Sequence, residues 1–252
     1  MTRRGVWIAR LATVATVATV VLGAGVALAE PTTTVPAAAG AVPSSPGSAL
    51  TMVGILTLAT LIPAAVLACT CFVRFVVVLG FVRTGLATQA APPNQVLVGL
   101  ALFMTVFVSA PVATEMYEKG GKPYMDGTMT EAQALEAATP PLRNFLLERT
   151  RPDDLALFYE VSHAERPNVA ADVPLRIAVP AFIISELRTA FEIGLAVLLP
   201  FLVIDLAVAS ILTALGMVMV PPQVVALPVK LLVFLAIDGW YLVVKSLLAG
   251  AM

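Results

Sequence analysis

The residues best suited to chemistry are acids and bases that interrupt long apolar segments. They are Arg74, Glu186, Arg188, Glu192, Asp205, Lys230, Asp238 and Lys245. A charge at the middle of a bilayer costs about 2.5–3.5 kcal/mol on insertion scales, so such residues usually pair or face water. The pattern therefore predicts ion pairs between helices, with a path for protons or ions as the alternative.

The turn between the last two apolar segments pairs four of these residues by depth. Counted from Val218, Asp205 lies about 13 residues before the turn and Lys230 about 12 after it. Glu192 and Lys245 lie about 26 and 27 residues away. Because a helix rises about 1.5 Å per residue, the two members of each pair should lie at nearly the same distance from the turn along their helices. The spacing predicts an Asp205–Lys230 contact and a Glu192–Lys245 contact, both of which would fix the register of a hairpin.

No arrangement typical of an enzyme accompanies these charges. The only histidine, His163, stands next to Glu165 in the polar middle of the chain, and no HExxH motif, phosphate-binding glycine loop or metal-spaced Cys/His set is present. Cys69 and Cys71 lie in an apolar segment and are expected to act as small apolar side chains. We expect no enzyme activity, no cofactor and no metal. The net charge of −1 gives no indication of nucleic-acid binding.

The composition places these charges in a membrane protein. Of 252 residues, 59% are hydrophobic and only 12% are charged, whereas soluble domains carry about a quarter charged residues. Pro63 is expected to kink the first apolar helix, and Pro221-Pro222 marks a tight turn between the last two. The expected fold is all-α, with about four long hydrophobic helices in hairpins: Leu50–Val82, Val96–Ala113, Pro180–Leu215 and Val220–Leu248.

The N-terminal 29 residues have the three parts of a signal peptide. Arginines precede the apolar run Leu11–Val26, and Ala27-Leu28-Ala29 supplies the small residues of a cleavage site. An uncleaved first helix is the alternative. The domain boundaries expected from composition are residues 1–29 (signal peptide), 30–48 (Pro/Thr/Ala-rich linker), 49–116 (first two hydrophobic helices), 117–178 (small helical domain) and 179–252 (C-terminal hairpin).

The polar middle, residues 117–178, is expected to form a small helical domain outside the bilayer. Thr130 and Gln133 fit a capping box that begins a helix. Pro140 and Pro141 are expected to end that helix and begin another, and Pro152, followed by two acids, begins a third. A cleaved signal peptide followed by four spans would place this domain in the periplasm.

Between about residue 50 and the C-terminus, several distinctive motifs follow one another. They include Arg83-Thr84-Gly85-Leu86, Ala91-Pro92-Pro93-Asn94-Gln95, Ser185-Glu186-Leu187-Arg188-Thr189-Ala190-Phe191, Pro200-Phe201-Leu202-Val203-Ile204-Asp205-Leu206, Leu227-Pro228-Val229-Lys230-Leu231 and Asp238-Gly239-Trp240. Together, and in this order, these motifs resemble the FliP family. The signal peptide, the motif at residues 91–95 and the motif at residues 238–240 favour its flagellar branch over the injectisome counterpart, SctR.

The resemblance implies a structural subunit of the flagellar type III export gate, in the bacterial inner membrane at the flagellar basal body. Several copies would assemble with FliQ-like and FliR-like subunits and other membrane proteins of the export apparatus, and unfolded flagellar proteins would pass through the pore. A small-molecule or ion transporter is the alternative from the residues alone, although no convincing internal repeat of the kind found in transporters is evident. A third possible function is that of an assembly or scaffold factor that does not contact the pore.

The resemblance also assigns a pore gasket to Met217, Val218 and Met219, with Val218 standing where the family commonly has methionine. Flexible thioethers suit a seal around varied chains; the alternative is that the two methionines pack the hairpin turn. A second set of residues is expected to pack between neighbouring subunits, with an internal small core as the alternative: Phe145, Phe158 and Glu186.

Overall fold

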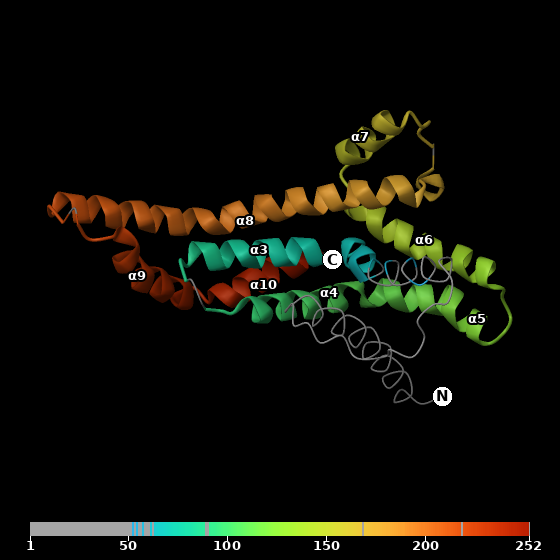
Figure 1. The fold of residues 1–252 in the computed structure, drawn as a ribbon, viewed down its shortest axis with the longest axis horizontal. Coiled ribbons are helices and arrows are strands. Elements are labelled where there is room, and N and C mark those ends of the chain that lie inside the picture. The colour runs from blue at the N-terminus through green and yellow to red at the C-terminus, as the bar shows by residue number, and fades with distance from the viewer. Residues whose placement is uncertain are drawn as a thin grey trace. The chain divides into compact units, whose positions relative to one another are not determined.

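The computed structural model describes residues 52, 54, 57, 61, 63–88, 91–167, 169–217 and 219–251. The predicted signal peptide, the predicted linker and Val218 lie outside the described residues. The described residues form helices joined by turns, without a strand (Figure 1). The all-α class predicted from the sequence is confirmed.

The chain divides into two compact units, Met1–Ala68 and Cys69–Met252. In the first unit, residues 63–68 are helical. The chain then turns at residues 69–71, where the Thr70 hydroxyl accepts a hydrogen bond from the Phe72 backbone N–H at 3.4 Å. Such a local bond offers the backbone an alternative to the helical ladder. The described part of the first apolar segment therefore breaks near Thr70, and the kink expected at Pro63 stays a prediction because several of its neighbours lie outside the described residues.

The second unit contains all the helices with defined bounds. They are α3 (Phe72–Gly85), α4 (Asn94–Met116), a π-helical turn (Tyr117–Gly121), α5 (Lys122–Met125), α6 (Glu131–Arg149), α7 (Pro152–Ser162), a 3-10 turn (Ala170–Asp172), α8 (Leu175–Ala214), α9 (Pro222–Ala236) and α10 (Gly239–Ala249).

The starts of α6 and α7 agree with the sequence signals. The Thr130 hydroxyl accepts from the Gln133 backbone N–H, and the Gln133 side chain accepts from the Thr130 N–H, so the predicted capping box is confirmed. α7 begins at Pro152. The predicted break at Pro140-Pro141 is wrong, because α6 continues through both prolines. The first of them is exposed, so water can replace the hydrogen bond that its ring removes.

Two stretches of the described chain are long and apolar enough to cross a bilayer, Asn94–Met125 and Leu175–Ala214. A third exists if α9 and α10, which meet at a 62° bend, form one broken span. Four spans were expected. Much of the first lies outside the described residues, and its described C-terminal part, α3, has 14 residues, about 21 Å of helix against a hydrocarbon core of about 30 Å.

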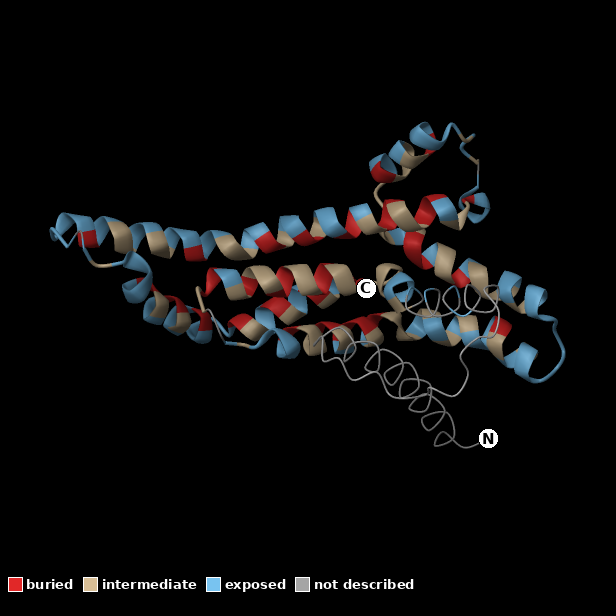
Figure 2. Ribbon diagram, viewed as in Figure 1, coloured by how far each residue is buried: buried red, intermediate tan, exposed pale blue. Residues whose placement is uncertain are grey.

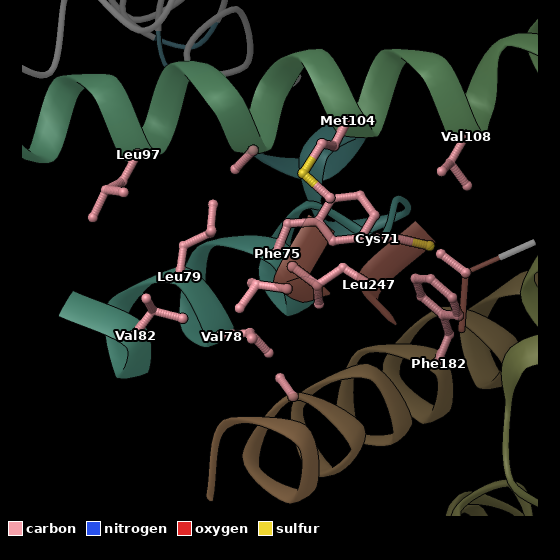
Figure 3. Close-up of a cluster of buried hydrophobic side chains, with 14 of the residues drawn as sticks. Cys71, Phe75, Val78, Leu79, Val82, Leu97, Met104, Val108, Phe182 and Leu247 are labelled. Atoms are coloured by element: carbon pink, nitrogen blue, oxygen red, sulfur yellow. The ribbon is translucent and has the colours of Figure 1, made fainter. Parts of the chain in front are cut away.

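The core of the second unit forms around α3. Phe75, Val78 and Leu79 on α3 are fully buried. Phe182 from α8 and Leu247 from α10 are buried in the same cluster, which α4 covers from the other side (Figure 3). In Figure 2 the buried residues concentrate on α3 and on the half of α8 nearer α6, whereas the other half of α8 is mostly exposed or half-buried.

The helices α3 and α8 pack closely at Gly194. A methyl group added there would lie 2.2 Å from Cδ2 of Phe81, a distance that forces the ring or the helix to move. We expect Gly194→Ala to lower the free energy of unfolding by roughly 1–3 kcal/mol through overpacking. Gly80→Ala on α3 is the control, because nothing lies within 4 Å of the added methyl group; it should be neutral or stabilising. Thermal unfolding of the two variants in detergent tests the difference, and equal stability would contradict this packing.

Candidate functional site

The structure brings together Asp205 and Lys230, the first pair predicted by depth. Lys230 Nζ donates a hydrogen bond to Asp205 Oδ2 at 2.7 Å. The lysine side chain is 2% exposed and that of the aspartate 37% exposed. The two residues come from α8 and α9, which run antiparallel on either side of the turn (Figure 1). An ion pair buried on one side holds this hairpin in one register.

The structure does not bring together Glu192 and Lys245, so this second predicted pair is wrong. Counting residues from the turn assumes straight helices, but α9 and α10 are separated by the 62° bend. Asp238 adopts a left-handed conformation at that bend, with φ of 53°. The ammonium of Lys245 instead lies 5.7 Å from the ring centroid of Tyr241.

Glu192 takes part in a polar network that joins α7 to α8. Its carboxylate accepts a hydrogen bond from Arg151 Nη2, and this bond raises the pKa of the arginine. Arg188 Nε lies 3.8 Å from the other Glu192 oxygen, and Arg188 Nη1 lies 3.9 Å from Asp154 Oδ1. Ser185, at the centre, accepts from the Arg151 backbone N–H at 3.0 Å and donates to Asp154 Oδ2 at 2.6 Å. The network fixes the start of α7 on α8.

Removing the Ser185 hydroxyl is expected to loosen α7. Ser185→Ala leaves the buried Asp154 carboxylate without its 2.6 Å donor, at a cost of about 1–3 kcal/mol. Amide hydrogen exchange in residues 152–162 should accelerate. Ser210→Ala on the same helix is the control, because that exposed hydroxyl bonds only to the Leu206 carbonyl within its own helix. Unchanged exchange in α7 would show that the network does not hold it.

A second cluster lies in the core, around Arg74. Arg74 Nη2 donates to Glu186 Oε1, and Arg74 Nη1 donates to the Gly250 carbonyl. The side chains of the ion pair are 4% and 1% exposed. Arg149 donates to the Ala251 carbonyl from Nε at 3.0 Å and from Nη2 at 2.7 Å. Two arginines therefore hold the end of α10 against α3 and α6.

The three side chains expected to pack between subunits lie in or against the core of this chain. Phe145 is 4% exposed, lies against Phe182 with ring centroids 6.1 Å apart, and has the Arg149 guanidinium 4.1 Å above it. Glu186 is 1% exposed beside Arg74. The chain's own helices therefore cover both, which agrees with the alternative of an internal core. Phe158 is half-buried and packs against the same core.

The tip of the α8–α9 hairpin presents the predicted methionines. Gly216 ends α8 in the left-handed conformation with φ of 74°, and the Met217 N–H bonds to the Leu212 carbonyl at 2.9 Å, as in a Schellman motif. Met217 is 45% exposed and Met219 is 97% exposed. Met219 is therefore not packed into the turn, whereas Met217 is partly covered. Within the described ranges, no three histidine, cysteine, aspartate or glutamate side chains gather to hold a metal ion.

Comparison with known proteins gives one family throughout. Residues 55–247 match the model described as the FliP family. The flagellar biosynthetic protein FliP of Bacillus subtilis is 47% identical over 206 residues, 82% of this chain and 93% of that protein. Its counterpart from Caulobacter vibrioides is 50% identical over 196 residues, 78% and 74% of the two chains. The FliP protein of Pectobacterium carotovorum is 47% identical over 193 residues, which cover 77% of this chain and 75% of that protein.

Proposed function

Because this chain belongs to the FliP family, we propose that it is a pore-forming structural subunit of the flagellar type III export gate. Its relatives are named flagellar biosynthetic proteins, and its long apolar helices support a membrane-associated component of flagellar protein export. In the proposed assembly, several copies join FliQ-like and FliR-like subunits and other export-apparatus membrane proteins. Unfolded flagellar proteins pass through the resulting pore.

The exposed hairpin tip carries the proposal. A methionine that is 97% exposed contributes nothing to the packing of its own turn, yet it stands at the end of two apolar helices. Unbranched thioethers can adapt to many surfaces. A ring of such tips, one from each copy, would close a pore while remaining soft enough for varied unfolded chains to pass. Val218, between the two methionines, would keep the ring apolar.

The proposed location follows from the sequence. After removal of the signal peptide, the chain would reside in the inner membrane at the flagellar basal body, with residues 117–178 on the periplasmic side. The polar character of α6 supports a position of this segment outside the lipid, because several of its side chains are exposed and charged, including Glu131, Glu136 and Glu148.

The gasket is tested by replacing both tip methionines. We expect Met217→Ala with Met219→Ala to make membranes that contain the assembled complex leak ions, because alanine removes the side-chain volume that closes the pore. Dye or ion flux from cells measures the leak. Met125→Ala is the control, since that side chain is 75% exposed on α5, away from the tip.

A stalled export substrate provides the second readout. A photo-cross-linker at position 219 should capture the substrate, whereas one at position 125 should not. An intact barrier in the assembled double variant, with no cross-link at 219, would contradict the gasket. An isolated chain that moves a small solute unaided would overturn the export role in favour of a transporter.

A further inference from the structure

The tip half of the α8–α9 hairpin, residues 202–233, is packed far less than the rest of the second unit; we call it the arm. Of its described residues, only Leu212, Ala226 and Lys230 are buried. The half of α8 that precedes the arm contains most of the buried residues of that helix (Figure 2). A hollow of about 620 Å³ lies between the arm and the wall formed by α3, the α3–α4 connection and the start of α4.

Each leg of the arm has a place at its base where the chain can bend. In α8, Pro200 lacks the N–H that would bond to the Ala196 carbonyl, and sharp helix kinks occur at such positions. In the other leg, the chain bends by 62° where α9 ends, at the left-handed residue Asp238. Pro200 lies about 18 residues before Val218 and Asp238 about 20 after it, which is roughly 27–30 Å of helix in each leg. The two bending points therefore lie at matching distances from the tip.

An aromatic cluster lies between these two points. Phe201 and Phe234 are 5% and 4% exposed, their ring centroids are 6.1 Å apart, and Trp240 meets Phe234 edge-on at 5.4 Å. Each phenyl ring also lies against a glycine, Phe201 against Gly85 and Phe234 against Gly239, where an added methyl group would overlap the ring. Glycine lets the ring rest on bare backbone. The rings can therefore tilt there without having to pass an interlocking side chain.

An ion pair ties the two legs together above this cluster. α9 contains a proline of its own, Pro228, at which this leg alone could bend. The pair between Asp205 and Lys230 lies two residues further along α9 and joins the leg to α8. A bend at the base therefore carries both legs and the tip together.

The hollow gives the arm a direction in which to move. Its opposite walls hold two buried polar atoms that have no hydrogen-bond partner among the described residues, Asp205 Oδ1 on the arm and Thr88 Oγ1 on the α3–α4 connection. The carboxylate oxygen accepts and the hydroxyl can donate. Buried polar atoms in proteins are nearly always hydrogen-bonded. Closing the hollow would pair these two atoms, while Asp205 Oδ2 keeps its bond to Lys230.

We propose that Pro200 and Asp238 form a hinge about which the arm closes onto the α3–α4 connection, and that Thr88 holds the closed position by donating to Asp205. A change of about 20° at the base, the size of a proline kink, moves the tip by about 10 Å. In the proposed pore, this movement draws the methionine tip aside and opens the seal. That consequence rests on the proposed function, whereas the hinge does not.

Spin labels on the purified full-length chain in detergent measure the movement. Met219→Cys places one label at the tip, and Val96→Cys places the other at the start of α4; both positions are exposed. Cys69→Ala removes the half-buried native thiol, and Cys71 is fully buried, out of reach of the label. We expect pulsed electron paramagnetic resonance to give two distance populations that differ by up to about 10 Å.

Matched variants assign the residues. Pro200→Ala restores the missing N–H and should leave only the longer distance, whereas Pro180→Ala, in the packed half of the same helix, should leave both. Thr88→Val should reduce the shorter-distance population about tenfold, the equivalent of one hydrogen bond to a charged group. Thr84→Val is its control, because that hydroxyl lines the same hollow but already bonds at 2.9 Å to a carbonyl of its own helix.

A single distance population in the chain with unchanged hinge residues overturns the proposal. Equal effects of the two proline variants, or of the two threonine variants, overturn it as well. Thermal unfolding identifies a variant that fails to fold, and the other proline or threonine comparison then provides the test. Because the distances are measured on the isolated chain, the result does not depend on whether the chain forms an export pore.

Discussion

A Glu186→Ala variant is expected to lose about 3–5 kcal/mol of unfolding free energy, because it leaves a buried charge without a partner. The Arg74 side chain is 4% exposed, so water cannot replace the lost carboxylate. Its remaining bond to the Gly250 carbonyl offers only a partial charge. Denaturant titration in detergent micelles, followed by circular dichroism, measures the loss.

A double substitution separates the ion pair from simple packing. Arg74→Met with Glu186→Met removes both charges and keeps apolar volume in the core, so it should recover most of the stability lost by Glu186→Ala. If Glu186→Ala costs less than about 1 kcal/mol, the typical value for an exposed pair, the pair is not buried as described.

Asp205→Ala is the second large effect, expected at about 3 kcal/mol. Lys230 is 2% exposed and would remain buried without its carboxylate. The loss should be smaller than for Glu186, because the 37% exposure of Asp205 lets water reach the vacated position. The same titration measures it.

The exchanged pair Asp205→Lys with Lys230→Asp should restore part of the stability, since the two charges meet again across the hairpin. Lys245→Ala is the matched control: this lysine is exposed, so its removal should change stability by no more than about 0.5 kcal/mol. A loss in Lys245→Ala as large as in Asp205→Ala would contradict the arrangement of α10.

Local signals in the sequence predicted where helices α6 and α7 begin, although the local signal at Pro140-Pro141 predicted a break that α6 does not have. The capping box at Thr130 and the helix start at Pro152 depend only on neighbouring residues, and both are present. The Asp205–Lys230 contact could be found by counting, because α8 and α9 run without a break between the turn and the pair.

Contacts between distant segments could not be predicted in this way. The Glu192–Lys245 prediction failed because one left-handed residue, Asp238, redirects the chain. Glu192 instead meets Arg151, which lies 41 residues earlier, and no periodicity within α8 indicates that partner. The same holds for Arg149, which reaches Ala251 across 102 residues.

The length of α8 has a consequence for its surroundings. Its 40 residues give a rod of about 60 Å, about twice the thickness of the hydrocarbon layer. Even if α8 stands perpendicular to the membrane, lipid tails can cover only about half of its length. Apolar side chains remain exposed along much of the helix, including Phe191, Leu199, Leu206 and Ile211. The turns that lie beyond the lipid must therefore be shielded from water by other polypeptide.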